Sequence, residues 1–446
     1  MSAKKPNFSP AYTIPLVIPA EQRIKELKEM LSKEDLQYEK ANISKLIELY
    51  ESGELKSLTM ETDIWLCNGE VLEKEPEPGE HDGPLWNEAD NQSQTPRTSY
   101  FTITVMTVNV LIVGAGAIGA FYGSRLAQVA NVKVSVICRS NYKAVVAGGF
   151  KVTSPKYGAY NFIPHRTFAN PKEAASSGIA WDYAVVSTKA LPDVSDDSQI
   201  LEGLVKDNHT AIVLIQNGLG VEEPYVKRFP RSSILSAVTI ASAAQNSPGV
   251  ITHNRWTRIS IGPYLPGSQS SKDESTTKAI EQNKAFIGLL QAGGIKDAEE
   301  YSHTKLQIVR WHKIAINASM NPSAVLSGGS TNNAMATNPE LYRHLKAVME
   351  EVLSTAPKIL GAPLPKELAT SEAILKSTQR NTSGSKPSML LDWEQGKKME
   401  IEVILGNPIR LARAHGVEMP LLQSMYALLK KAQENRDAAQ EKASKL

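Results

Sequence analysis

The stretch that decides the fold is Val108–Leu126, VNVLIVGAGAIGAFYGSRL. It opens with an apolar run typical of a buried strand, passes through a glycine turn and ends in an apolar helix pattern. The glycines fit the spacing G-x-G-x-x-G, in which they serve a tight turn, the approach of backbone to a pyrophosphate, and close packing of helix on strand. The sequence therefore predicts a dinucleotide-binding turn at a helix amino terminus. The residues of this predicted turn are Gly114, Ala115, Gly116, Ala117, Ile118 and Gly119.

The whole chain has an ordinary globular composition. Its 446 residues leave room for two or three domains, and it is 41% hydrophobic and 22% charged. A formal net charge of +2 gives no reason to expect a nucleic-acid partner, and no stretch predicts a membrane span. Cys67 and Cys138 make neither a disulfide framework nor a zinc cluster, so no metal site is predicted. The amino terminus lacks a secretory apolar core, which predicts a cytoplasmic protein and leaves a mitochondrial location open.

The patterns predict an α/β protein with three regions. Residues 1–105 form a helical extension that ends in an acidic linker, KEPEPGEHDG and the polar residues after it. Residues 106–302 form a Rossmann-type domain, and residues 303–446 form an all-helical domain. The carboxyl-terminal helices make a homodimer conceivable and say nothing firmer about assembly.

Local patterns predict the bounds of several elements. A β-strand reversal is expected around 254–256, a surface loop over 263–277 and a helix over 278–291. Further helices are expected over 339–360, 365–378, 389–395, 399–415 and from 420 to the end, and Pro322 is expected to disrupt the helix that starts at 303.

The second predicted strand, KVSVI, bears on cofactor choice. It is followed by Cys138, Arg139 and Ser140, with no acidic residue to bind a ribose 2′-hydroxyl. An arginine here favours the 2′-phosphate of NADP, and a solvent-facing arginine is the alternative. Lys189 and Asn217 follow the next two strands, at the sheet edge where open parallel sheets bind ligands.

A polar stripe lies on the otherwise apolar helix pattern after 303. Lys313, Asn317 and Asn321 are spaced i, i+4 and i+8, so they share one helix face. The stripe is either a solvated face or a set of one cation and two amides that binds a substrate. A desolvated lysine could give a proton to an oxygen that becomes an alkoxide during hydride addition.

Several ordered motifs between about Val108 and Met425 make the chain resemble the ketopantoate reductase (2-dehydropantoate 2-reductase) family. They are GAGAIG, the Arg after the second strand, STKA, QNG, RWHKIAINASMNP, KPSML and MEIEVILGNPIRLARAHGV. The resemblance implies an NADP-binding Rossmann domain followed by a helical domain, with the active site between them.

The resemblance also implies roles for particular residues. The three glycines would hold the pyrophosphate of NADPH, with Arg139, Lys189 and Asn217 as further cofactor contacts. Lys313 would be the catalytic lysine and Glu400 a substrate-binding or orienting acid. Asn317, Asn321 and Ser388 would bind the substrate.

The implied reaction is NADPH-dependent reduction of a branched 2-oxo acid to the (R)-2-hydroxy acid. Two substrates stay open: ketopantoate, in pantothenate biosynthesis, and 2-oxoisovalerate, which some fungal members reduce in secondary metabolism. The chain departs from the family pattern at Lys397–Met399 and at Leu390–Asp392, and either Asn332 or Asn333 could match a further family asparagine. A protein of another class, a non-catalytic NADP sensor or scaffold that interacts through residues 1–105, is the competing hypothesis.

Overall fold

The computed structural model describes residues 28–29, 40–52, 64–67, 70–72, 100–103, 107–267 and 274–444. The chain forms two compact units. One comprises Met1–Val108 with Arg125–Lys133 and Gly288–Gly294, and the other comprises the remaining residues. The predicted acidic linker lies outside the described residues, and the predicted domain boundaries stay predictions.

The first unit contains a helix and a small antiparallel sheet. The helix is α2 (Lys40–Ser52), on which Ile43 and Ile47 are buried one turn apart and so mark its inner face. The sheet has the order β2-β1-β3. Its strands are β1 (Ile64–Cys67), β2 (Glu70–Leu72) and β3 (Tyr100–Ile103).

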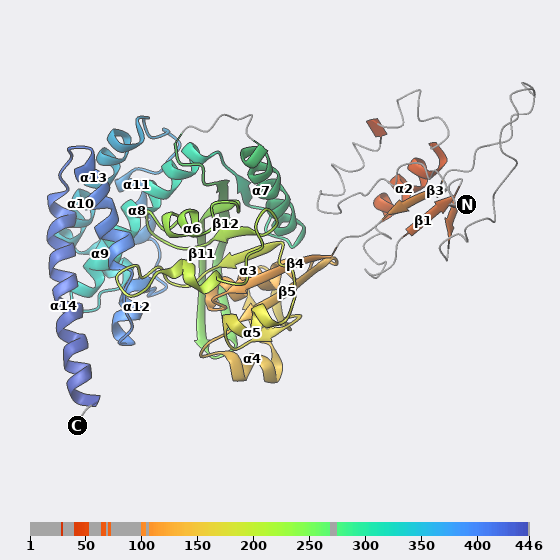
Figure 1. The fold of residues 1–446 in the computed structure, drawn as a ribbon. Coiled ribbons are helices and arrows are strands. Elements are labelled where there is room, and N and C mark those ends of the chain that lie inside the picture. The colour runs from red at the N-terminus through yellow and green to blue at the C-terminus, as the bar shows by residue number, and fades with distance from the viewer. Residues whose placement is uncertain are drawn as a thin grey trace, which may run out of the picture. The chain divides into compact units, whose positions relative to one another are not determined.

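The second unit is built on a ten-stranded sheet of order β7-β6-β12-β11-β10-β9-β4-β5-β8, with β13 paired to β12 (Figure 1). Its centre is parallel, since β4, β9, β10 and β11 run in one direction. Every residue of β9 and β10 is buried, as expected for strands covered on both faces. The predicted Rossmann-type α/β fold is confirmed. The strands are β4 (Val108–Val113), β5 (Val132–Ile137), β6 (Phe150–Ser154), β7 (Gly158–Phe162), β8 (Thr167–Phe168), β9 (Tyr183–Val186), β10 (Ala211–Leu214), β11 (Ile234–Ser247), β12 (Val250–Pro263) and β13 (Ala298–Glu300).

The long hairpin β11–β12 corrects one sequence prediction. The chain reverses between Ser247 and Val250, and not around Asn254–Trp256, which lies inside β12. The register shifts near Ala241 and Ser242, opposite that segment, and Trp256 has a positive φ of 57°. A bulge therefore produced the turn-like sequence signal.

Each helix predicted after residue 277 has a counterpart in the structure, with the bounds of 339–360 as predicted and the others changed, and several further helices were not predicted. The described helices and helical turns are α3 (Ala117–Leu126), α4 (Tyr142–Gly148), α5 (Pro171–Ser176), the 3₁₀ turn η3 (Asp197–Leu201), α6 (Glu223–Arg228), α7 (Glu274–Ala292), α8 (His303–Leu326), α9 (Asn332–Thr337), α10 (Pro339–Leu360), α11 (Ser371–Gln379), α12 (Ser388–Glu394), the π-helix η4 (Glu402–Gly406), α13 (Asn407–Ala414) and α14 (Pro420–Ser444).

Four of these helices differ from the sequence prediction. The helix α7 starts inside the predicted loop, and α11 starts at Ser371, where Thr370 caps it. The helix α8 continues past Pro322 to Leu326, because buried contacts of its last turns outweigh one lost backbone hydrogen bond. The segment 399–415 contains a π-helical turn that helix periodicity does not reveal.

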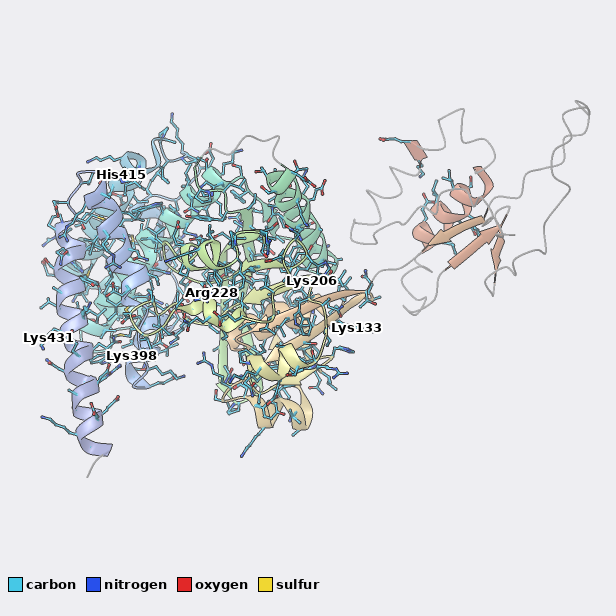
Figure 2. All side chains as sticks on the ribbon, viewed as in Figure 1. Lys133, Lys206, Arg228, Lys398, His415 and Lys431 are labelled. Atoms are coloured by element: carbon cyan, nitrogen blue, oxygen red, sulfur yellow. The ribbon has the colours of Figure 1, made fainter. Side chains whose placement is uncertain are left out.

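The helical region of the second unit gathers beside the sheet, with α8, α10 and α14 packed on one another (Figure 1). Its apolar core includes Ala190, Leu219 and Val221, which belong to the loops after β9 and β10. The carboxyl ends of these strands are thus anchored in the helical core. Charged residues such as Lys206 and Lys431 point outward (Figure 2). None of the helices in the described ranges combines the length and apolarity needed to cross a membrane.

Candidate active site

The glycine turn between β4 and α3 has the shape that a dinucleotide needs. Gly114 has φ +94°, and a Cβ there would lie 2.7 Å from the Thr188 backbone nitrogen. A Cβ on Gly119 would collide with Ser187 Oγ and the Gly114 carbonyl oxygen. At Gly116 a Cβ would meet nothing within 4 Å, so this position faces open space. The turn is therefore packed where helix meets strand and open where a pyrophosphate would approach.

The end of β5 is tied to this turn. The Asn141 side chain donates to the Ala115 carbonyl oxygen at 2.9 Å and also bonds the Gln245 side chain. Arg139, two residues earlier, is exposed just beyond the strand. The predicted contact of Arg139 with a 2′-phosphate stays a prediction. Asn141 could not be predicted from the sequence, since a lone asparagine carries no signal of its own.

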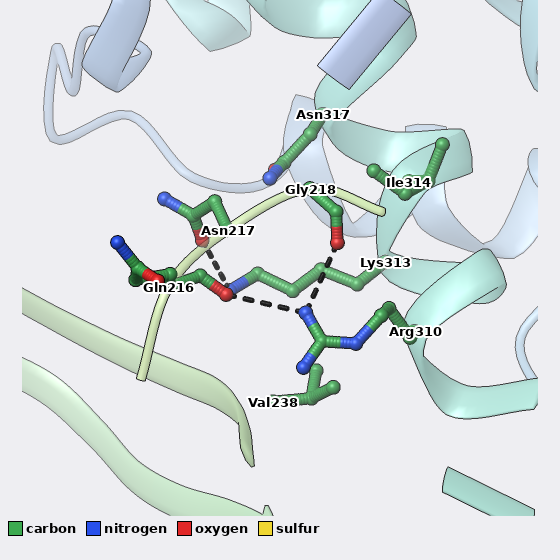
Figure 3. A pocket seen from close by; sticks show the side chains of 8 residues that line it. All are labelled: Gln216, Asn217, Gly218, Val238, Arg310, Lys313, Ile314 and Asn317. Carbon is green, nitrogen blue, oxygen red and sulfur yellow. Dashed lines mark hydrogen bonds between the residues drawn. The ribbon is translucent and has the colours of Figure 1, made fainter. Parts of the chain in front are cut away.

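The predicted lysine belongs to a chain of polar contacts (Figure 3). Lys313 Nζ donates to Asn217 Oδ1 at 2.9 Å. Asn217 Nδ2 donates to Glu400 Oε2 at 3.4 Å, and Glu400 Oε1 accepts from the Ala190 N–H at 3.2 Å. The fold thus brings together α8, the loops after β9 and β10, and the segment before η4.

Burial shifts the pKa of Lys313 and of Glu400, the two ionisable groups in this series of hydrogen bonds. Burial, followed by the positive charge of Arg310, lowers the pKa of Lys313 to about 8, although Glu400 acts in the opposite direction. Burial raises the pKa of Glu400, while the Ala190 N–H, the Asn217 amide and the charge of Lys189 counteract the shift. A lysine with this pKa is protonated at neutral pH and still releases its proton readily.

The two predicted amides continue the lysine face of α8. Asn317 and Lys313 line one pocket together with Asn217 (Figure 3). Asn321 lies one turn further along α8 and is 4% exposed, and its Nδ2 has no hydrogen-bond partner. A buried amide N–H₂ without a partner is costly, and a ligand oxygen would satisfy it.

The predicted Ser388 and Lys189 are linked through α12. Lys189 forms an ion pair with Asp392 of α12, and Ser388 stands exposed one turn earlier on that helix. Residues four apart share a helix face, so Ser388 and Asp392 lie on the same side of α12. Asp392 also has a raised pKa, because burial outweighs the effect of the Lys189 ammonium.

Asn332 and Asn333 lie at the start of α9 and are not among the residues that line this pocket. Asn332 Nδ2 donates to Ser385 Oγ at 3.3 Å, and Asn333 Nδ2 donates to the Gln379 carbonyl oxygen at 2.6 Å. Both side chains therefore brace α9 against the chain around α11.

A buried ionic group behind the lysine was not predicted. Arg310 and Glu222 are 3% and 1% exposed, and Arg310 Nε lies 3.4 Å from Glu222 Oε1. Arg310 lies one turn before Lys313 on α8 and lines the same pocket. The motif RWHK contains this arginine, but Glu222 is 88 residues away in sequence, and no local pattern joins them.

The loop after β9 connects the two halves of the site. Thr188 packs on Gly114 of the dinucleotide turn, and Ala190 donates to Glu400 of the lysine chain. A dinucleotide turn joined in this way to a half-buried lysine and two amides is the architecture of a nicotinamide-dependent oxidoreductase.

Comparison with known proteins gives the family. The family model described as "Ketopantoate reductase PanE/ApbA" matches residues 110–266, and its C-terminal counterpart matches residues 305–433. A crystal structure of 2-dehydropantoate 2-reductase from Methylococcus capsulatus is 31% identical, with a TM-score of 0.61, and the match covers 74% of this chain and 98% of that one. The chain therefore belongs to the ketopantoate reductase family, as the sequence motifs predicted, and its family indicates an oxidoreductase.

Two further similarities extend this result. The Saccharomyces cerevisiae protein YDL144C is 28% identical over 345 residues, which cover 72% of this chain and 92% of the yeast protein. A D-mandelate dehydrogenase solved with NADH and anilino(oxo)acetate shares the fold at 18% identity and a TM-score of 0.59, covering 74% of this chain and 99% of that one.

Proposed function

We propose that the protein reduces a branched 2-oxo acid to the (R)-2-hydroxy acid with NADPH, and that Lys313 is the proton donor. Ketopantoate and 2-oxoisovalerate are the two candidate substrates. The observation that carries the proposal is the hydrogen-bonded series Lys313–Asn217–Glu400, which begins in a pocket also lined by Asn317.

Lys313 supplies what the carbonyl oxygen of such a substrate needs. Hydride addition turns this oxygen into an alkoxide, and a nearby ammonium both stabilises the developing charge and can donate its proton. With a pKa lowered to about 8, Lys313 carries the proton at neutral pH and parts with it more easily than an exposed lysine does. The Asn217 oxygen fixes the ammonium at 2.9 Å, and Glu400 in turn fixes the Asn217 amide.

The substrate groups have partners on α8 and α12. The unpartnered Nδ2 of Asn321 is a donor for a substrate oxygen, and Asn317 offers a second amide beside Lys313. The exposed hydroxyl of Ser388 is a third polar group for the same ligand. Fixed polar groups around a small 2-oxo acid supply orientation and specificity.

The cofactor would be held by the predicted glycine turn. The open space at Gly116 supports a pyrophosphate there, with Arg139 toward a 2′-phosphate and Lys189 and Asn217 toward the nicotinamide end. When bound, the reduced nicotinamide supplies the hydride, and the protein contributes position and charge. The fold neighbour solved with NADH uses the other cofactor, so the choice of NADPH depends on Arg139.

Initial rates of NADPH and NADH oxidation with ketopantoate and with 2-oxoisovalerate test the proposal. Turnover of either acid, with a higher kcat/KM for NADPH, is the expected result. A preference for ketopantoate would mean that the amides bind its hydroxyl group, whereas a preference for 2-oxoisovalerate would mean that the changed residues near Glu400 and Asp392 reshaped the pocket. Cofactor binding without turnover of any small 2-oxo acid would refute the enzyme and favour the sensor hypothesis.

A further inference from the structure

Arg310, which lines the pocket beside Lys313, uses most of its hydrogen-bond donors on the protein itself. Arg310 is 3% exposed and lies one turn before Lys313 on α8. One terminal nitrogen, Nη1, donates to the carbonyl oxygens of Gln216 and Gly218 at 3.2 and 3.0 Å. These two carbonyls flank Asn217, so the guanidinium fixes the backbone on both sides of the residue that holds Lys313 (Figure 3).

The other side of the guanidinium attaches this loop to the sheet. Arg310 Nη2 donates to Ser236 Oγ at 2.5 Å and to the Ala237 carbonyl oxygen at 3.1 Å, at the start of β11. Ser236 Oγ donates in turn to Glu222 Oε1 at 2.5 Å. The arrangement joins α8, the Asn217 loop and β11 through one side chain, and a planar fork of five donors is suited to that task.

Stability alone is a weak reason for such a pair. Removing two charges from water costs free energy that their attraction often fails to repay, so apolar replacements of similar size are frequently as stable. Glu222 is 1% exposed and lies beside the guanidinium edge that faces away from Asn217. The pair is therefore better explained by what it does to its surroundings.

We propose that Arg310 is a positioning residue of the proposed reaction, which aims Asn217 at Lys313 and, partly balanced by Glu222, sets the local field in which Lys313 releases its proton. The inference rests on the proposed function. It does not make Arg310 a substrate contact, since its donors are directed to the protein itself.

The charges around Lys313 agree with this role. Arg310 on α8 is the largest cause, after burial, of the lowered pKa of Lys313, and Glu400 before η4 acts against it. Glu222 lies behind Arg310, while Lys189 and Asp392 lie behind Glu400. The Arg310–Glu222 pair is thus the part of this field whose charge can be changed without replacing Asn217, which accepts from Lys313, or Glu400.

Removing the charge of Arg310 and removing the charge of Glu222 are expected to shift the pH profile of kcat in opposite directions. The protonated lysine is the active form, so kcat for reduction falls as the pH rises through the Lys313 pKa. In Arg310→Met the loss of a positive charge moves this alkaline limb to higher pH by about one unit, and in Glu222→Gln the loss of a negative charge moves it to lower pH. Arg310→Met also lowers kcat by roughly 100-fold, because Asn217 is no longer held on both sides.

Two variants serve as controls. Arg310→Lys keeps the charge and loses the fork, so kcat falls while the limb stays near its wild-type position. Arg343→Met removes an arginine that is 74% exposed on α10 and leaves both quantities unchanged. If Arg310→Met does not fold, the charge-neutral double variant Arg310→Met/Glu222→Gln replaces it. Its limb moves to higher pH by less than in Arg310→Met, because the loss of the Glu222 charge offsets part of the shift.

A measurement without turnover separates this inference from the proposed function. The Lys313 pKa is read by NMR from protein with ¹³Cε-labelled lysine, with the resonance assigned by its absence in Lys313→Arg. If no 2-oxo acid is reduced, the proposed reaction fails, and the NMR titration still shows whether the pair controls Lys313. The inference would be overturned if, in folded Arg310 and Glu222 variants, neither the Lys313 pKa measured by NMR nor the alkaline limb of the kcat–pH profile shifted.

Discussion

The site has two parts that differ in chemistry: the glycine turn, called here the first wall, and the polar group around Lys313, called the second wall. The glycine turn consists of uncharged backbone within six residues, and the absence of side chains there leaves space for a ligand. The Lys313 wall consists of ionisable and amide side chains from segments up to 183 residues apart, and its work is to hold charge where burial makes charge costly. The first wall is therefore sensitive to added atoms, and the second to lost functional groups.

The largest effect is expected from the second wall. Lys313→Ala removes the proposed proton donor and should lower kcat by about 1000-fold, since the alkoxide loses both its proton source and the neighbouring charge. Initial rates with saturating NADPH measure the loss. Lys305→Ala, an exposed lysine two turns earlier on α8, should keep wild-type turnover. Near-wild-type kcat in Lys313→Ala would disprove the assignment.

Stability should change in the opposite sense at the same position. The folded pKa of Lys313 lies below its unfolded value of 10.5, so the folded state holds the charged form at a cost below about pH 8. The cost disappears as the pH rises toward 10.5, where the unfolded chain also loses the proton. Lys313→Met should thus be about 2 kcal/mol more stable than wild type at pH 7, and the advantage should shrink by pH 10. Denaturant unfolding at the two pH values tests the sign.

The next largest effect is expected at Glu400. Glu400→Gln keeps the shape and removes the carboxylate that accepts from Ala190 and Asn217, and kcat/KM should fall by about 100-fold. Because burial raises the Glu400 pKa, wild-type kcat/KM should decline as the pH falls through that raised value. The variant should lack this acid limb, whereas the exposed Glu418→Gln should retain it. An identical acid limb in Glu400→Gln would assign the titration to another group.

Added atoms test the first wall with a matched pair. Gly116→Ala meets nothing within 4 Å, so its thermal stability should stay near wild type while the Kd for NADPH rises roughly tenfold. Gly119→Ala collides with Ser187 and Gly114, so it should lose about 1–3 kcal/mol of stability. Calorimetric binding and thermal melts of both variants give the comparison. Equal loss of stability in the two variants would contradict the inference that the turn is open at Gly116 and closely packed at Gly119.

The contrast between the walls also explains what the sequence could predict. The glycine turn is contiguous, and Lys313, Asn317 and Asn321 share a face through helix geometry alone, so local patterns indicate both. Glu400 was identified only through family resemblance, because nothing local joins it to Asn217. The Arg310–Glu222 pair was missed for the same reason, and the π-helical turn after Glu400 has no periodic signature. Contacts made by tertiary packing between distant segments lie beyond local patterns.

The smallest effect is expected at Arg139, which follows β5 two residues before the Asn141 contact to the first wall and acts by charge. Its side chain is exposed, so solvent screens any contact with a 2′-phosphate. Arg139→Ala should raise the KM for NADPH by roughly fivefold at low salt and leave the KM for NADH unchanged, since NADH lacks the phosphate. Arg231→Ala, an exposed arginine before the amino end of β11, should alter neither constant. Equal changes for the two cofactors would show that Arg139 supports the fold of the β5 end and does not distinguish the nucleotides.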